Sequence, residues 1–398
     1  MKKPPHVQVE LITESADLER LAQNLASETV LAVDLETDSY HCYFSRVCLL
    51  QFTSPRFSAL VDPLALPTLE PLRPVFADAR IRKIFHAADY DIRCLHRDFG
   101  FEVHNLFDTM VGCKLLGEQN LGLADLLGAY FSVTLDKSFQ CANWARRPLP
   151  EEMLAYALED TTHLIPFAEL VERRLREAGR LTWAQEEFAL LEKLRHSEMP
   201  GHLRQAVTEA AAFTPLQLAA LESLLRWRDA EARRQGCRYL HIVGTSHLAA
   251  LAAALPETSQ EMEKIAEVPF ALKRRYGVSF LRILDEVRKL PEEALPEPAP
   301  EPVPHPRRGV GNSLLKDLKD WRRKAAQDLG LDPGTLINNH LLEEIARCRP
   351  KNLAALSSIS GIKQWQLREL GSSLLRQVTH HAQCLSGSSG KTPQTGSL

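Results

Sequence analysis

Short apolar runs alternate with segments of helical spacing along the N-terminal half of the chain. Runs typical of strands cover residues 6–12, 29–36, 46–53, 57–63 and 81–87, and the second, third and fourth are close enough together to form an antiparallel meander. Helical spacing covers residues 15–26 and 89–99, and nearly all of the chain from residue 107 to about 195 has the same character. This order predicts an α/β domain with a mixed sheet, followed by helices.

The C-terminal half contains two similar helical segments on either side of a proline-rich stretch. Residues 291–306 include seven prolines and have no helix or strand period, which predicts an extended, semi-rigid linker. Trp227 in the first segment corresponds to Trp321 in the second, as His247 does to His340. The two segments are therefore predicted to be copies of one small all-α domain, too long to be units of a solenoid.

These patterns divide the chain into domains, a linker and a tail. We expect an α/β domain in residues 1–208, a first helical domain in 209–290, the linker in 291–306, a second helical domain in 307–380 and a disordered tail in 381–398. Thr214 can cap the first helix after the α/β domain, with Pro215 in its first turn. A chain of 398 residues that is 44% hydrophobic has enough apolar material for a core in each domain.

Cysteine usage and hydrophobicity predict where the protein resides. The eight cysteines are scattered and include no C-x-x-C pair, which favours free thiols in a reducing cytoplasm and argues against a zinc finger. No run approaches the ~18 apolar residues that a membrane span needs. The N-terminal "MKKPPHVQVE" lacks the apolar core of a secretory signal. We therefore expect a cytoplasmic protein that is not associated with a membrane.

Charge is distributed unevenly along a chain whose net charge is only −3. Residues 1–208 contain 22 basic and 30 acidic residues, whereas residues 209–290 contain 12 and 10, and residues 307–380 contain 13 and 7. An acidic front half and a basic back half indicate that metal chemistry and polyanion binding are separated along the chain. Basic runs at Lys273–Arg275 and Trp321–Lys324 are candidate phosphate contacts, although such runs are more often solvated helix faces.

An apolar run at residues 31–33 ends in two carboxylates, Asp34 and Glu36. Residues i and i+2 of a strand share a face, so the two carboxylates point the same way and repel each other. When two acidic residues are spaced in this way and no other acid is nearby, one of them usually caps a turn or forms an ion pair with a basic residue. Further acids in suitable positions argue against that simple interpretation. One of them is Asp91, which lies near the start of the helix predicted after a buried strand. Tyr156 and Asp160 are four residues apart and share a helix face.

Four carboxylates gathered at the edge of a sheet need positive charge between them. Two hard divalent cations would supply it, and oxygen-only ligands suit Mg²⁺ or Mn²⁺. Two such ions about 3.5–4 Å apart promote in-line attack of water on a phosphodiester, since one lowers the pKa of a bound water and the other stabilises the leaving oxygen. A tyrosine hydroxyl one helical turn before a metal-binding aspartate, as Tyr156 is before Asp160, is placed to orient that water.

Several segments together resemble a known nuclease family. The segments "VDLETDSY", "HAADYDIRCLHRDFG", "FDTMVGCKLL" and "YALEDTTHL" are similar to the motifs of the DEDDy 3′→5′ exonucleases, above all to those of ribonuclease D and the related exonuclease of the nuclear exosome. The two C-terminal segments resemble HRDC domains, and a nuclease followed by two of them is the arrangement of bacterial ribonuclease D. The resemblance covers roughly residues 7–380.

The resemblance implies a fold and a set of site residues. The family fold is RNase H-like, with a mixed sheet whose acids cluster at one edge, followed here by two small all-α HRDC-like domains. Asp34 and Glu36 match the first motif, Asp91 the second, and Tyr156 and Asp160 the third. The resemblance therefore implies that all five are catalytic and that the four acids bind two divalent ions, Mg²⁺ or Mn²⁺.

The resemblance also implies a function, with two alternatives. It implies a hydrolytic 3′→5′ exoribonuclease that releases nucleoside 5′-monophosphates and trims the 3′ ends of tRNA precursors and other structured RNA, with no obligate protein partner. The same motifs occur in proofreading exonucleases, so a DNA exonuclease is the first alternative. RNA is favoured because the motifs are close to those of ribonuclease D and no polymerase or helicase segment is attached. The second is an inactive nucleic-acid-binding adaptor, which would have lost a motif acid, yet all four acids and the tyrosine are present.

Overall fold

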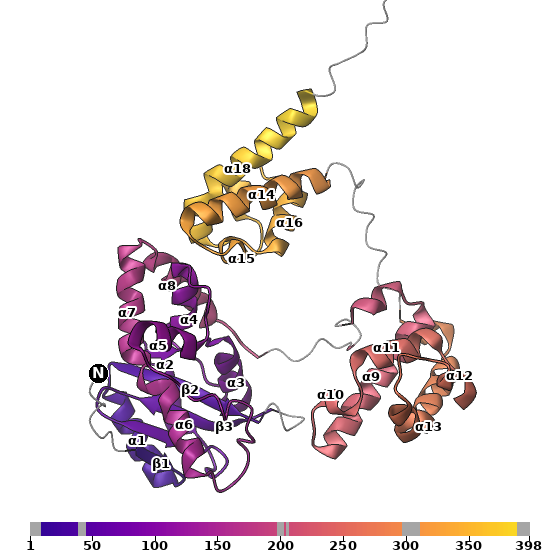
Figure 1. Ribbon diagram of the computed structural model, residues 1–398, viewed down its shortest axis with the longest axis horizontal. Coiled ribbons are helices and arrows are strands. Elements are labelled where there is room, and N and C mark those ends of the chain that lie inside the picture. Colours follow the sequence, from indigo (N-terminus) through magenta and orange to yellow (C-terminus); the bar gives the residue numbers. More distant parts are fainter. Residues whose placement is uncertain (1–8, 39–44, 197–202, 204–206, 297–310, 388–398) are drawn as a thin grey trace, which may run out of the picture.

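Figure 1 shows the computed structural model, which describes residues 9–38, 45–196, 203, 207–296 and 311–387. The start of the first predicted strand, most of the predicted linker and the end of the predicted tail lie outside these residues. An α/β domain is followed along the chain by two helical domains. Within the described ranges, no helix is both long and apolar enough to cross a membrane.

A six-stranded mixed sheet forms the centre of the α/β domain, with the strand order β1-β4-β3-β2-β5-β6. β2, β3 and β4 form the predicted antiparallel meander, whereas β1 is parallel to β4, and β5 and β6 continue parallel to β2. The predicted α/β class and mixed sheet are therefore confirmed. The strands are β1 (Val9–Ile12), β2 (Val30–Thr37), β3 (Val47–Thr53), β4 (Ser58–Val61), β5 (Arg82–Phe85) and β6 (Leu106–Asp108).

Helices cover the sheet, and two of them determine the position of the site. α6 contacts β2, β3 and β4, and α7 contacts β2 and β5, so the two helices lie along the central strands. The helices of this domain are α1 (Ser15–Ala26), α2 (Arg73–Ala77), α3 (Asp89–Phe99), α4 (Thr109–Leu116), α5 (Leu123–Phe131), α6 (Glu151–Thr162), α7 (Leu164–Glu177) and α8 (Leu181–Leu191).

The structure differs from the sequence prediction in two places between residues 107 and 195. Strand β6 has only three residues, too few for an alternating pattern to be recognisable. Residues 132–150 contain neither helix nor strand. Pro148 and Pro150 in this segment lack the backbone N–H that a helix interior requires.

The two helical domains repeat one order of helices, long, short, medium, short and long. In the first domain Thr214 caps α9 as predicted: the Gln217 backbone N–H donates to its hydroxyl, and the Gln217 side chain accepts from the Thr214 N–H. The helices are α9 (Pro215–Gln235), α10 (Tyr239–Ile242), α11 (Thr245–Ala254), α12 (Ser259–Glu263) and α13 (Phe270–Arg288), then α14 (Gly311–Leu329), α15 (Pro333–Leu336), α16 (Asn339–Cys348), α17 (Leu353–Ser357) and α18 (Gln364–Gly387). Because α18 extends to Gly387, the helix continues into the segment predicted as a disordered tail.

The two helical domains differ in what they contact. The first has a core of its own, in which Trp227 packs edge-on against Tyr276 and Phe280. The core of the second is continuous with that of the α/β domain. Trp183 of α8 stacks on Trp365 of α18, with ring centroids 4.7 Å apart and planes 14° from parallel. Figure 1 accordingly shows the second helical domain next to α8.

Candidate active site

Strand β2 carries two of the predicted site residues. The side chains of residues 31–33 are fully buried, which anchors the strand in the middle of the sheet. Asp34 and Glu36 follow on one face of the strand and are partly buried. The register between β2 and β3 shifts between Glu36 and Thr37, where the strand ends. Irregularities of this kind are common next to active sites because they redirect a side chain.

Helix α3 brings a third carboxylate to the same place. Asp91 lies in the first turn of α3 and is only 7% exposed. The turn before the helix is held by Asp108, whose carboxylate accepts hydrogen bonds from the backbone N–H groups of Ala87 (3.2 Å) and Ala88 (2.7 Å). The local sequence thus places Asp91 at a helix N-terminus, where the helix dipole favours a negative charge.

Helix α6 brings the fourth carboxylate and the tyrosine. Tyr156 and Asp160 lie one turn apart on α6 and are partly buried. The next residue, Thr161, is fully buried and its hydroxyl shares a hydrogen bond of 2.8 Å with that of Thr53 in β3. Ala157 packs in a small core with Trp144. These contacts fix α6 on the face of the sheet that carries Asp34 and Glu36.

The four carboxylates form one electrostatic cluster. Oxygens of Asp34, Glu36 and Asp160 all lie within 4.8 Å of one another, close enough to bind one metal ion. Burial, and then the charges of Asp91, Asp160 and Glu36, raise the pKa of Asp34 well above its ordinary value. Asp91 therefore belongs to the same cluster, although it reaches the cluster from a different element.

The other three acids are perturbed in the same direction. Burial, followed by the charges of Asp160 and Asp91, raises the pKa of Glu36 to about 9. Burial is also the main cause that raises the pKa of Asp91 to about 8 and that of Asp160 to about 7. Without a cation, the cluster thus tends to retain protons at neutral pH.

The charge of the cluster is not compensated by any cationic side chain among the described residues. In the described part of the chain, none of the four carboxylates forms an ion pair with Lys, Arg or His. Acids elsewhere on α3 do form such pairs, as Asp89 does with Arg93 at 2.8 Å. The cluster offers only oxygen ligands, which hard divalent cations prefer. This ligand set therefore indicates that the site uses a divalent cation.

Tyr156 is placed beside the acids with its hydroxyl protonated. Burial, and then the charges of Asp160 and Glu36, raise the pKa of the Tyr156 hydroxyl. Its ring lies against Phe139 and Trp144, with centroids 5.8 and 6.0 Å away, which limits the directions in which the hydroxyl can point. The side chain can therefore act as a fixed hydrogen-bonding group but not as a phenolate at neutral pH.

Nearby polar residues have structural partners. His86 is half-buried between the Thr109 hydroxyl and the Leu121 carbonyl, at 2.9 Å from each. Asp108 caps α4, and its carboxylate accepts a hydrogen bond from the Val111 N–H at 3.0 Å. In the basic runs, Lys273 donates to two backbone carbonyls, at 3.0 and 2.7 Å, and Arg322 donates to another at 2.6 Å. These contacts favour the structural interpretation of at least one residue in each run.

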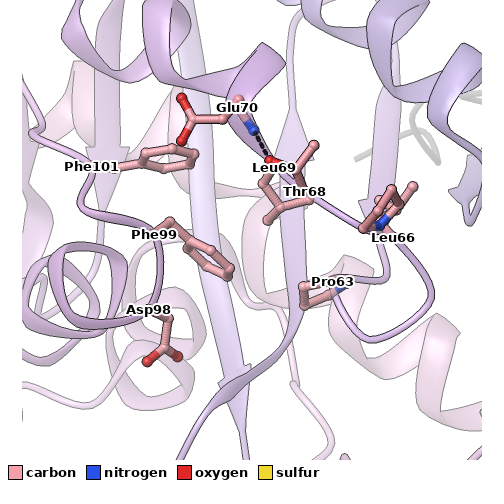
Figure 2. Close-up of a pocket in the computed structure, with 9 residues that line it drawn as sticks. Pro63, Leu66, Thr68, Leu69, Glu70, Asp98, Phe99 and Phe101 are labelled. Carbon is pink, nitrogen blue, oxygen red and sulfur yellow. Dashed lines mark hydrogen bonds between the residues drawn. The ribbon is translucent and has the colours of Figure 1, made fainter.

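Figure 2 shows a pocket of about 300 Å³ that contains none of the predicted site residues. It lies between residues 63–70 and the end of α3. Its acids are already engaged, because Asp98 accepts from the Val47 N–H at 2.7 Å and Glu70 pairs with Arg73 at 2.7 Å. The pocket is otherwise largely apolar, and it lacks the uncompensated charge that distinguishes the acidic cluster.

Comparison with known proteins agrees with this geometry. The family model of the 3′-5′ exonucleases matches residues 9–176, and the HRDC domain model matches residues 217–284 and 312–378. The chain is 30% identical to ribonuclease D of Cronobacter turicensis over 72% of this chain and 78% of that protein. It is also 30% identical to ribonuclease D of Sphingobium indicum, over 77% of this chain and 80% of that protein.

The chain belongs to the ribonuclease D family. It is accordingly a hydrolytic 3′→5′ exoribonuclease, as the motifs predicted. Its fold matches the crystal structure of Escherichia coli RNase D, with a TM-score of 0.75 at 24% identity, over 94% of this chain and 99% of that one. Both helical domains match the HRDC model, as the resemblance of the two C-terminal segments implied.

One polar residue near the acids, Gln51, was not identified from the sequence. Gln51 lies in the strand run "VCLLQFT" and pairs in register with Asp34. A polar residue inside an otherwise apolar buried strand was the available signal. Its meaning depends on the pairing between β2 and β3, which the sequence alone did not provide.

Proposed function

We propose that Asp34, Glu36, Asp91 and Asp160 hold two divalent cations, Mg²⁺ or Mn²⁺, and that this centre trims the 3′ ends of tRNA precursors and other structured RNAs. The observation that carries the proposal is the convergence of four carboxylates without a cationic partner among the described residues. Like charges in a partly buried cluster repel strongly, so such a cluster is stable in its ionised form only with cations between its members.

The residues would divide the work of hydrolysis between them. When bound, the cations lower the pKa of water and stabilise the charge that develops on the phosphate. Tyr156 hydrogen-bonds the attacking water and aligns it with the terminal phosphodiester, which is a positional contribution. Water attacks phosphorus, the bond to the 3′ oxygen of the upstream nucleotide breaks, and that oxygen takes a proton. The departing nucleotide therefore retains a 5′-phosphate.

The distribution of charge supports a structured RNA as substrate. The catalytic domain is acidic, so attraction to phosphates away from its metal site is weak, whereas residues 307–380 contain 13 basic and 7 acidic residues. The second HRDC domain is docked on α8, which keeps this basic surface attached to the nuclease. A substrate long enough to touch both regions would gain affinity over a short oligonucleotide.

A panel of substrates tests the proposal. Purified protein should shorten 3′-extended tRNA and single-stranded RNA in Mg²⁺ or Mn²⁺ and release 5′-monophosphates. Excess EDTA should stop the reaction, and robust hydrolysis in EDTA would contradict metal-assisted chemistry. A circular RNA is the control for cleavage from an end, since an exonuclease requires a free terminus and should leave the circle intact. Equal rates on DNA and RNA would contradict the proposed substrate class but not the metal site.

A further inference from the structure

Gln51 lies in the middle of the sheet with its side-chain amide unpartnered among the described residues. It is 0% exposed, and neither its Nε2 nor its Oε1 has a hydrogen-bond partner in the part of the chain that the structure describes. A buried polar group without a partner destabilises the folded protein, because it has lost its hydrogen bonds to water. Such groups are rare enough in native proteins that each one points to a strain, a function or a missing ligand.

Strand pairing places this amide beside the acidic cluster. In the antiparallel pairing of β2 and β3, Gln51 lies directly opposite Asp34. Directly opposed residues project to the same face, with Cβ atoms about 4.5–5.5 Å apart. A glutamine amide can span the remaining distance to the carboxylate. The unpartnered amide and the uncompensated carboxylate are therefore neighbours on the face that α6 covers.

The other neighbours of Gln51 in the sheet offer no alternative partner. Leu49 precedes it by two residues on the same face, and Leu60 is its register partner in β4. Thr53, the next residue on that face, already shares hydrogen bonds of 2.9 and 2.8 Å with hydroxyls of β4 and α6. Among the residues that surround Gln51 in the sheet, Asp34 is thus the polar group with capacity for a further hydrogen bond.

We infer that Gln51 is a positioning residue: when the cation is bound, its Nε2–H group donates a hydrogen bond to one oxygen of Asp34 and so turns the other oxygen toward the cation. This inference rests on the proposed function, in which Asp34 is a cation ligand. Carboxylates that bind metals are commonly held by such hydrogen bonds, and loss of the supporting partner typically weakens metal affinity 10–100-fold. A neutral amide supplies the donor without the positive charge of Lys or Arg, which would compete with the cation.

The test is metal binding without catalysis. Mn²⁺ is titrated into metal-free full-length protein without RNA, and free Mn²⁺ is followed by electron paramagnetic resonance. Gln51→Met keeps the length of the side chain and removes both polar groups. It should raise the dissociation constant for Mn²⁺ about 10–100-fold. Thermal unfolding in EDTA should be unchanged or shifted to higher temperature, because the variant buries no unsatisfied amide.

Gln366→Met is the matched control, because Gln366 is buried in the second HRDC domain, away from the acidic cluster, and its amide is bonded to the Leu336 carbonyl and the Lys363 N–H. It should lower the unfolding temperature and leave Mn²⁺ affinity unchanged. A Gln51→Met protein that binds Mn²⁺ like the wild type would overturn the inference. If that variant does not fold, a crystal structure of the wild type with Mn²⁺ decides: Gln51 Nε2 should lie within about 3.2 Å of an Asp34 oxygen, and separation beyond hydrogen-bond reach would overturn it.

Asp34→Asn separates this inference from the proposed function. If Asp34→Asn weakens Mn²⁺ binding and Gln51→Met does not, Asp34 is a ligand and only the role of Gln51 is wrong. If Asp34→Asn leaves Mn²⁺ binding unchanged, the proposed metal site itself fails.

Discussion

Two groups of carboxylates in the catalytic domain are built in opposite ways. At the candidate active site, four carboxylates converge without a cationic partner in the described part of the chain. At the contact with the second HRDC domain, Glu187 accepts hydrogen bonds from Lys363 Nζ at 2.6 Å and from Trp365 Nε1 at 2.9 Å. Glu186 accepts the backbone N–H groups of Gln364 and Trp365, at 2.5 and 2.8 Å, at the start of α18.

The difference distinguishes acids that stabilise the fold from acids that are available to a ligand. At the contact, charge and hydrogen-bond partners come from the protein, so ionised carboxylates contribute to docking without any added ion. At the site, the ionised carboxylates oppose folding until a cation is present. The same substitution of carboxylate by amide should therefore have opposite consequences in the two places.

The largest expected effect is that of Asp34→Asn on catalysis. Loss of one ligand oxygen from the cluster should lower the rate of RNA hydrolysis on the order of 10³-fold, by analogy with other electrostatic groups of active sites. In EDTA the same variant should be more stable than wild type, because like-charge repulsion is reduced. Asp89→Asn, on the same domain but paired with Arg93 at the surface, is the control and should retain activity. Near-normal turnover by Asp34→Asn would remove the contrast between the two groups.

Tyr156→Phe should have the next largest effect, on the order of 10²-fold in the single-turnover rate. The hydroxyl acts on the attacking water, so RNA affinity should change little. Tyr130→Phe is the control, because the Tyr130 hydroxyl bonds Glu118 and Arg174 instead of lying among the site acids. Single-turnover cleavage is measured beside the RNA dissociation constant. An unchanged cleavage rate would show that Tyr156 only packs against its aromatic neighbours.

The pH dependence of stability should show the uncompensated charge directly. In the folded protein the pKa of Asp160 is raised to about 7 and that of Glu36 to about 9, whereas carboxyls of the unfolded chain titrate near pH 4. Between these pKa values the folded state retains protons that the unfolded chain has released. The free energy of unfolding therefore falls as pH rises from near 4 to about 9.

In EDTA the free energy of unfolding of the wild type should therefore fall by on the order of a few kcal/mol between about pH 5 and pH 9. Urea titrations at several pH values measure it. Saturating Mg²⁺ should oppose the fall, since cation binding favours the ionised acids. Asp34→Asn should make the slope shallower. A wild-type stability that rises with pH across this interval would contradict the description of the cluster.

The smallest effect is expected at the HRDC contact. Glu187→Gln removes the charge that faces Lys363 and should lower the free energy of unfolding by about 1–3 kcal/mol, opposite in sign to Asp34→Asn in EDTA. Urea unfolding of the full-length variants, with hydrogen exchange at the start of α18, measures it. Glu177→Gln, at an exposed position of α7, should change stability by less than about 0.5 kcal/mol. If Glu187→Gln stabilised the protein, the contact would not depend on paired charge.

Local sequence was sufficient for most of the elements and for proposing the candidate site acids. The helix predicted for residues 89–99 is α3 itself, and the predicted meander is β2, β3 and β4. Each acid was marked by its neighbours in the chain: Asp34 and Glu36 follow a buried run, and Asp160 lies one turn after Tyr156. The strand β6 was missed because three residues carry too little periodicity, and the long segment before α6 was assigned to helices despite its prolines.

By itself, the sequence determined the strands, the helices, the duplicated domain and the residue types of the acidic motifs, because all of these depend on neighbours within a few turns of chain. The tertiary structure alone decided which distant groups meet. Strand register, which pairs residues far apart in the chain, placed Gln51 opposite Asp34, and the packing of α6 on β3 brought Asp160 within reach of Glu36. The stacking of Trp183 on Trp365 joined the second HRDC domain to the nuclease. Such contacts depend on the shape and burial of surfaces that exist only after each domain has folded.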